Sequence, residues 1–141
     1  MSEGLMIITN NPSISSFLET PKNNIKRKYL VNVNGEITKN IIEKTKKNLL
    51  IDGQFYKKIK LNVIVSKSHF HSLEIELNEG KNREIRKILS HFNLKIKKLK
   101  RIEYGPFKLG NLEIGKLKEI SDKRLSILLK KVKFRDENNF W

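Results

Sequence analysis

The segment LEIELNEGKNREIRKILSHF, residues 73–92, decides how this chain folds. It opens with alternating apolar and polar side chains, which predict a strand with one buried face. Apolar side chains then recur at the spacing i, i+3, i+4 and i+7, namely at Ile85, Ile88, Leu89 and Phe92. That spacing predicts a helix with one apolar stripe. The segment therefore predicts a strand that leads through a short turn into a helix.

The turn between the predicted strand and helix has the features of an anion-binding site. Gly80 leads into the helix, Asn82 is predicted as its N-cap, and Lys81 and Arg83 add positive charge. Free backbone N–H groups and the positive end of the helix dipole favour anions at such a place. We therefore expect nucleic-acid phosphate here, with Arg86 one turn further along the helix and directed over its start.

Composition limits the class of protein. A chain of 141 residues with 38% hydrophobic side chains can bury one core and is most simply one domain. It contains no cysteine, which excludes disulfides and thiolate metal sites. Its apolar runs are too short to span a bilayer, and no signal-peptide pattern opens it. We therefore expect a cytoplasmic protein without membrane contact.

The charge balance indicates a polyanionic partner. Thirty Lys and Arg face 15 Asp and Glu, which gives a formal net charge of +15. An AT-rich coding sequence is an alternative explanation, because it enriches Lys, Ile and Asn together. Against that alternative, residues 81–101 alone hold nine Lys or Arg, several of them arginines.

The rest of the chain predicts an α+β fold with a mostly antiparallel mixed sheet and helices packed on it. Strands are expected at residues 4–9, 27–33, 61–65, 70–77, 95–104 (with a bulge) and 118–120. Helices are expected at residues 12–19 after Asn11, at 38–47 with Thr38 as N-cap, and after Ser121 or Asp122. Asn34-Gly35 and Asp52-Gly53 are turn signals.

With these elements in place, the motif EGKNREIRK at residues 79–87 resembles one in the catalytic domain of bacterial ribosomal-RNA pseudouridine synthases of the RsuA/RluB branch. The resemblance continues through residues 99–106 and 109–112. Upstream, KYLV at 28–31 is similar to the family's K-x-Y element, and residues 4–10 to the tail of its first motif, G-R-L-D-x-x-[ST]-x-G-L-L-L-[LI]-T-N. The resemblance implies a catalytic domain at residues 1–133, followed by a polar tail at 134–141.

The resemblance also implies roles for particular residues in isomerising a specific uridine of ribosomal RNA to pseudouridine. Tyr29 would stack on the target uracil and help deprotonate C5, although a core aromatic is the structural alternative. Arg86 would pair with the catalytic aspartate and keep it ionised. RNA contacts would come from Lys28, Lys81, Asn82, Arg83, Lys87, Lys100 and Arg101. No metal or other cofactor is expected.

The family's nucleophile, the aspartate of G-R-L-D, has no counterpart in this sequence. Aligning Ser2-Glu3-Gly4-Leu5 with the motif places it just before Met1, and Asp52, Asp122 and Asp136 lie elsewhere. We therefore expect an N-terminally truncated domain, without the family's RNA-binding domain and inactive alone. A separate polypeptide carrying the missing segment is a candidate partner beside ribosomal RNA.

Two other functions remain open from the sequence. One is a non-catalytic RNA-binding remnant that docks on ribosomal RNA through the basic surface at residues 81–101. The other is a ribosomal or nucleoid protein unrelated to the family, supported by charge alone. Among the histidines, His69 and His71 have same-face strand spacing, but no third ligand lies at a suitable spacing, so we expect solvated hairpin side chains rather than a metal site.

Overall fold

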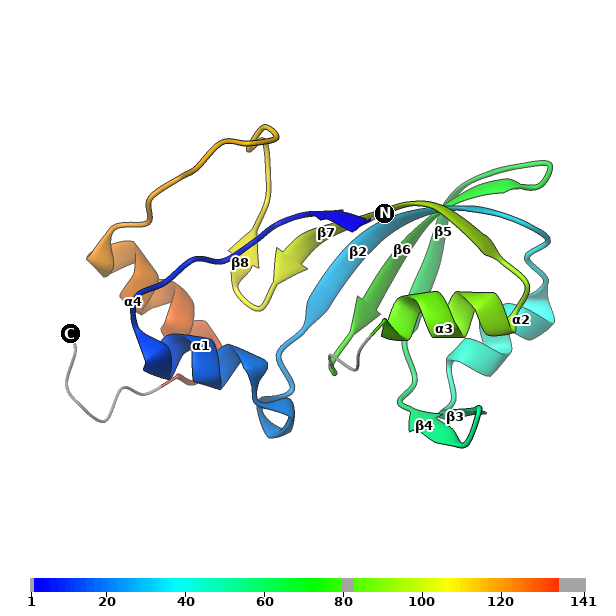
Figure 1. Cartoon of the computed structure of the whole chain (residues 1–141), viewed down its shortest axis with the longest axis horizontal. Coiled ribbons are helices and arrows are strands. Elements are labelled where there is room, and N and C mark those ends of the chain that lie inside the picture. The colour runs from blue at the N-terminus through cyan, green and yellow to red at the C-terminus, as the bar shows by residue number, and fades with distance from the viewer. Residues whose placement is uncertain (1, 80–82, 135–141) are drawn as a thin grey trace.

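The computed structural model describes residues 2–79 and 83–134 and shows an α+β arrangement, as expected from the sequence (Figure 1). The strands are β1 (Ser2–Gly4), β2 (Arg27–Asn34), β3 (Leu49–Ile51), β4 (Gln54–Tyr56), β5 (Lys60–Lys67), β6 (Phe70–Leu77), β7 (Lys95–Tyr104) and β8 (Phe107–Lys108). The helices are α1 (Pro12–Glu19), α2 (Lys39–Thr45), α3 (Glu84–His91) and α4 (Asp122–Lys131), with a 3-10 turn at Pro21–Asn23.

The main sheet is mixed and mostly antiparallel. Its strand order is β1-β7-β2-β6-β5, with β8 paired to β7, and only the pairing of β1 with β7 is parallel among the described strands. The register of β2 against β7 shifts at two places, which confirms the irregularity predicted for residues 95–104. The remaining two strands, β3 and β4, form a separate hairpin.

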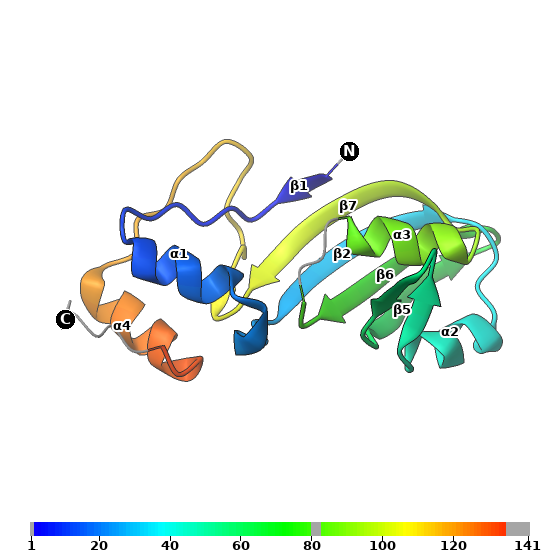
Figure 2. The same cartoon turned by 60° about the horizontal axis from the view of Figure 1, so that its bottom comes forward.

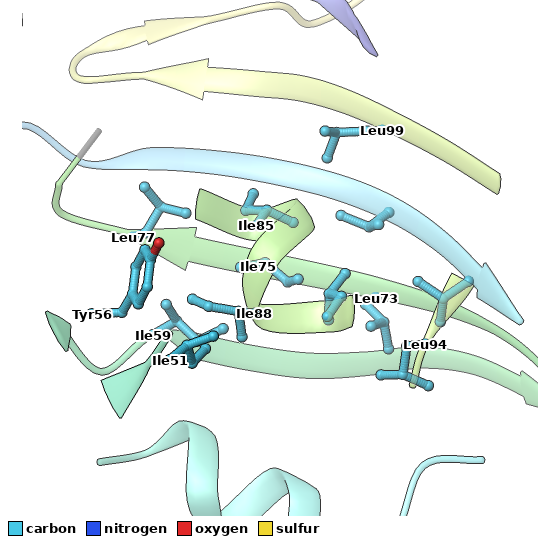
Figure 3. Packing of buried hydrophobic residues seen from close by; sticks show 13 residues of the cluster. Ile51, Tyr56, Ile59, Leu73, Ile75, Leu77, Ile85, Ile88, Leu94 and Leu99 are labelled. Carbon is cyan, nitrogen blue, oxygen red and sulfur yellow. The ribbon is translucent and has the colours of Figure 1, made fainter. Parts of the chain in front are cut away.

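One core lies between the sheet and α3. The helix presents the predicted apolar stripe to the sheet, and Figure 3 shows Ile85 and Ile88 lying over Ile75 of β6. Phe92, the last residue of the stripe, is the C-cap and packs partly against this core. The β3–β4 hairpin closes one side of it through Ile51 and Tyr56. The predicted strand and helix at residues 73–92 are thus confirmed.

A second core lies at the other end of the molecule, where α1 and α4 lie side by side (Figures 1 and 2). The side chain of Asn11 accepts a hydrogen bond from the Ser13 amide, and Ser121 caps α4 in the same way, so both predicted helix starts are confirmed. Phe134, predicted as the first residue of the tail, is buried there against Phe17, with ring centroids 5.0 Å apart.

Three predicted details differ from the structure. The strand expected at residues 4–9 is only Ser2–Gly4, and beyond it Met6 and Ile8 are 73% and 75% exposed. These side chains have no second sheet face to cover them, because the chain leaves β7 after Leu5 and runs on to α1. No strand forms at residues 118–120. At Asp52-Gly53 the sequence predicts a turn, and the structure adds a short strand on each side of it, β3 and β4.

His71 corrects the expectation of a solvated side chain. It is buried, with Nε2 2.9 Å from the carbonyl oxygen of Gly35 and Nδ1 2.7 Å from the hydroxyl of Ser66. Because a carbonyl oxygen only accepts hydrogen bonds, Nε2 carries the ring proton and donates a hydrogen bond to the carbonyl of Gly35. His71 therefore ties the β5–β6 hairpin to the turn after β2, while His69 is exposed.

Candidate active site

A pocket of about 630 Å³ lies between the two cores, where β2, β7 and α3 face the chain around β1. Tyr29 of β2 and Arg86 of α3 both line it, so the structure brings together the two residues predicted to be catalytic. Pockets of this size suit a small organic group. Ligand pockets are typically about 300–1,000 Å³ in volume, and a nucleobase with its sugar is a ligand of the size that they hold.

Tyr29 reaches the pocket through the alternation of β2. It shares a face with Val31 and Val33, which are fully buried in the first core, whereas Tyr29 itself is half-buried at the edge of that core. In the register of the sheet, Tyr29 lies opposite Ile75 on one side and Arg101 on the other. The aromatic ring therefore belongs to the core at one edge and to the pocket at the other.

Arg86 reaches the same pocket from the first turn of α3. The helix begins at Glu84, so that Arg83 is its N-cap and the predicted cap, Asn82, is one residue too early. Arg83 also lines the pocket and has a left-handed backbone, with φ 53° and ψ 32°. Gly80, Lys81 and Asn82 lie outside the described residues, so the predicted contacts of Lys81 and Asn82 stay predictions.

Arg101 lines the pocket but uses its guanidinium to hold the chain. Its Nε and Nη2 donate to the carbonyl oxygen of Leu5 at 2.9 and 2.6 Å, and its Cζ lies 4.6 Å from the centre of the Tyr104 ring. Predicted as an RNA contact, Arg101 thus holds the pocket wall formed by residues 3–6 against the sheet. Whether it also touches RNA stays a prediction.

Arg27 and Tyr104 are pocket residues that the sequence did not reveal. Arg27 donates to the carbonyl oxygens of Ile25 and Leu18, and its Cζ lies 4.9 Å from the centre of the Tyr104 ring. The two residues lie opposite each other in the β2–β7 register. That register depends on the bulges in this strand pair, so sequence spacing could not have placed them together.

The other predicted RNA-binding residues lie away from the pocket. Lys28 is on the opposite face of β2, where its Nζ is 3.2 Å from Glu74 and 3.5 Å from Glu103. The hydrogen bond to Glu74, with the negative charge of both glutamates, raises the pKa of Lys28 above 10.5 despite its partial burial. Lys100 faces the same way, as its register with Leu30 shows, and Lys87 is an exposed residue of α3. Their contacts with RNA stay predictions.

The charged side chains that line the pocket are four arginines and three glutamates: Arg27, Arg83, Arg86, Arg101, Glu3, Glu19 and Glu84. Among the residues that the structure describes, no aspartate lines the pocket; Asp52 lies in the turn of the β3–β4 hairpin, and Asp122 is the first residue of α4. Within residues 2–79 and 83–134, no cluster of histidine, aspartate and glutamate is suited to a metal ion. In the same residues no helix is long and apolar enough to cross a membrane.

Comparison with known proteins gives a consistent result. The sequence model of a family described as RNA pseudouridylate synthase matches residues 1–91. An uncharacterized RNA pseudouridine synthase of Rickettsia bellii is 43% identical over 122 residues, which are 86% of this chain and 53% of that protein. Ribosomal large subunit pseudouridine synthase B of Pseudomonas aeruginosa is 28% identical over 131 residues, which are 92% of this chain and 34% of that protein.

The fold is also found among solved structures. A pseudouridylate synthase crystal structure matches with a TM-score of 0.71 and 20% identity, covering 81% of this chain and 49% of that one. At this identity the likeness concerns the fold alone. The chain spans about half the length of the most similar of these curated relatives.

Proposed function

The chain belongs to the RNA pseudouridylate synthase family, and from that premise we propose that its pocket receives a uridine of ribosomal RNA for isomerisation to pseudouridine. The observation that carries the proposal is the meeting of Tyr29 and Arg86, from β2 and α3, in one pocket. The similarity to the large-subunit synthase of Pseudomonas aeruginosa supports ribosomal RNA as the substrate class. We assign this role to residues 1–133.

The pocket suits a base that has left its stack. A uridine inside folded RNA must rotate outward before its glycosidic bond can be reached. The half-buried ring of Tyr29 offers a face for the uracil, and its hydroxyl is the group that would assist loss of the C5 proton. Arg83, exposed at the start of α3, offers a cation to the phosphate of the extruded nucleotide.

The role proposed for Arg86 is to pair with a carboxylate. A guanidinium beside an aspartate favours its ionised form, which is the form that can act as a nucleophile. No aspartate of the described chain lines this pocket. We therefore propose that the carboxylate comes from a polypeptide segment outside these 141 residues, and that the 141 residues alone do not isomerise uridine.

The test is to incubate the purified chain with unmodified ribosomal RNA and to map pseudouridine chemically. We expect no conversion by the chain alone, and conversion after addition of a polypeptide that carries the family's G-R-L-D segment. In that complemented assay Arg86→Gln abolishes conversion. Stoichiometric conversion by the chain alone would refute the role given to an outside carboxylate, and full activity of Arg86→Gln would refute the pairing.

A second candidate is RNA binding without catalysis, which is favoured because no aspartate of residues 2–79 and 83–134 lines the pocket. The two functions differ in what Tyr29 does. In a uridine pocket, Tyr29→Ala weakens binding of an RNA whose target uridine is unpaired more than binding of a fully paired duplex. In a binding module that recognises only phosphate charge, Tyr29→Ala leaves the affinity for each of the two RNAs as it is in the wild type.

A further inference from the structure

The β3–β4 hairpin presents an apolar pair to solvent on the side away from the core. Leu50 and Phe55 lie directly opposite each other in the hairpin register and are 58% and 68% exposed. Their neighbours Ile51 and Tyr56 point the other way and are buried. The hairpin is therefore anchored by one face, and the other face holds an exposed aromatic ring on a fixed backbone.

The sequence on either side of this pair is strongly basic. Between residues 44 and 58 the chain has Lys44, Lys46, Lys47, Lys57 and Lys58 but only one acidic residue, Asp52. All five lysines are exposed, and within the described part of the chain only Lys46 forms an ion pair, to Glu43 at 3.0 Å. An exposed aromatic ring among cations is the combination that binds unpaired nucleic acid, because bases stack on the ring while the lysines contact phosphates.

The hairpin is also connected to the wall of the pocket. The carboxylate of Glu79, the first residue of the EGKNREIRK motif, accepts a hydrogen bond from the backbone amide of Lys57 at 2.9 Å. Glu79 is buried and follows β6, so it attaches the end of the hairpin to the chain that leads to Arg83 and Arg86. Figure 1 shows β3 and β4 beside α3.

We propose that Leu50 and Phe55 form a stacking platform for an unpaired base of the same RNA strand whose uridine enters the pocket. The proposal rests on the proposed function, since it assumes that the pocket binds RNA. A polyanion fits this surface better than an apolar protein partner, because a protein covering the pair would also have to desolvate the surrounding lysines. The Phe55 ring contacts the base, and the lysines contact phosphates on either side.

Tryptophan fluorescence tests the stacking directly. The chain has a single tryptophan, Trp141, so the double variant Trp141→Phe, Phe55→Trp places the only indole on the hairpin. Titration with a single-stranded oligouridine long enough to reach the pocket should quench this indole. The matched control is Trp141→Phe, Phe70→Trp, because Phe70 is partly exposed at the far end of β6 and should show no quenching. An unquenched indole at position 55 would overturn the proposal.

Affinity measurements separate stacking from apolar contact. Phe55→Tyr should keep the affinity for oligouridine, whereas Phe55→Leu, which keeps an apolar side chain, should weaken it about fivefold or more. Lys57→Gln together with Lys58→Gln should lower the slope of log affinity against log salt by about 1.4, because each phosphate contact adds about 0.7 for single strands. Equal affinity of Phe55→Leu and the wild type would overturn the platform.

Tyr29→Ala shows which hypothesis fails. If Tyr29→Ala weakens binding while Phe55→Leu does not, the pocket stands and the platform falls. If neither change matters, the proposed RNA-binding function falls as well. Sedimentation of the wild type without RNA completes the test: self-association abolished by Phe55→Leu would show that the pair covers a second copy of the chain, and would also overturn the proposal.

Discussion

Arg101→Lys distinguishes an arginine that holds the pocket wall from one that only attracts RNA. Lysine keeps the charge but cannot donate from two nitrogens to the carbonyl oxygen of Leu5, as Arg101 does at 2.9 and 2.6 Å. Loss of one charge-assisted hydrogen bond costs about 1.5–3 kcal/mol. Weaker contact with the Tyr104 ring adds about 0.5 kcal/mol. We expect the free energy of unfolding to fall by about 2–3.5 kcal/mol, and the melting temperature by roughly 5–12 °C.

The assay is urea unfolding followed by circular dichroism. A lower midpoint with an unchanged m-value shows that the variant has lost stability. Lys100→Met is the matched control, because Lys100 is the neighbour on the opposite face of β7 and should change stability by less than about 0.5 kcal/mol. Hydrogen exchange at the Leu5 amide, which donates to the Arg101 carbonyl at 2.8 Å, should accelerate in the variant. Unchanged stability with weakened RNA binding would refute the structural role.

Four further changes test the fold. Gly4→Ala should separate β1 from β7, because a Cβ there would overlap the main chain of the facing strand; loss of protection in β1 amides would show it. Leu129→Ala should cost about 2–5 kcal/mol in chemical unfolding, since Leu129 is 0% exposed, whereas Ile127→Ala on the same helix, 51% exposed, should cost little. His71→Phe should cost about 1–3 kcal/mol by leaving the partly buried Gly35 carbonyl without its donor. Lys28→Met should lower the free energy of unfolding by up to about 1 kcal/mol below pH 10.5. Because the pKa of Lys28 is raised in the folded protein, the difference between wild type and variant should shrink as the pH rises through that pKa. A difference that stays constant to higher pH would contradict the ion pairs.

The sequence was sufficient wherever a local period determines structure. The alternation before Asn78 and the helical stripe after Arg83 are set by side chains close in sequence, so β6 and α3 were predicted correctly. Tyr29 and Arg86 were placed in one site by resemblance to a family, and the structure puts both beside one pocket. Periodicity alone would not have paired them, because they come from different elements.

The sequence was insufficient where distant segments determine structure. The guanidinium of Arg101 has no sequence neighbour that reveals its partner, because Leu5 lies at the other end of the chain and reaches it through the β1–β7 pairing. The strand expected at residues 4–9 ended early for a related reason: an apolar run becomes a strand only where another strand is available to pair with it. The β3–β4 hairpin was missed because its two strands are too short to show a period.

Arg83 shows that the start of α3 is not optimised for folding. An L-residue other than asparagine or aspartate loses about 1 kcal/mol in the left-handed region, and glycine would occupy φ 53° without that loss. Arg83→Gly should therefore make the protein more stable while removing a cation from the pocket. A change that raises stability and lowers RNA affinity would be the signature of a trade-off between stability and the RNA contact proposed for Arg83.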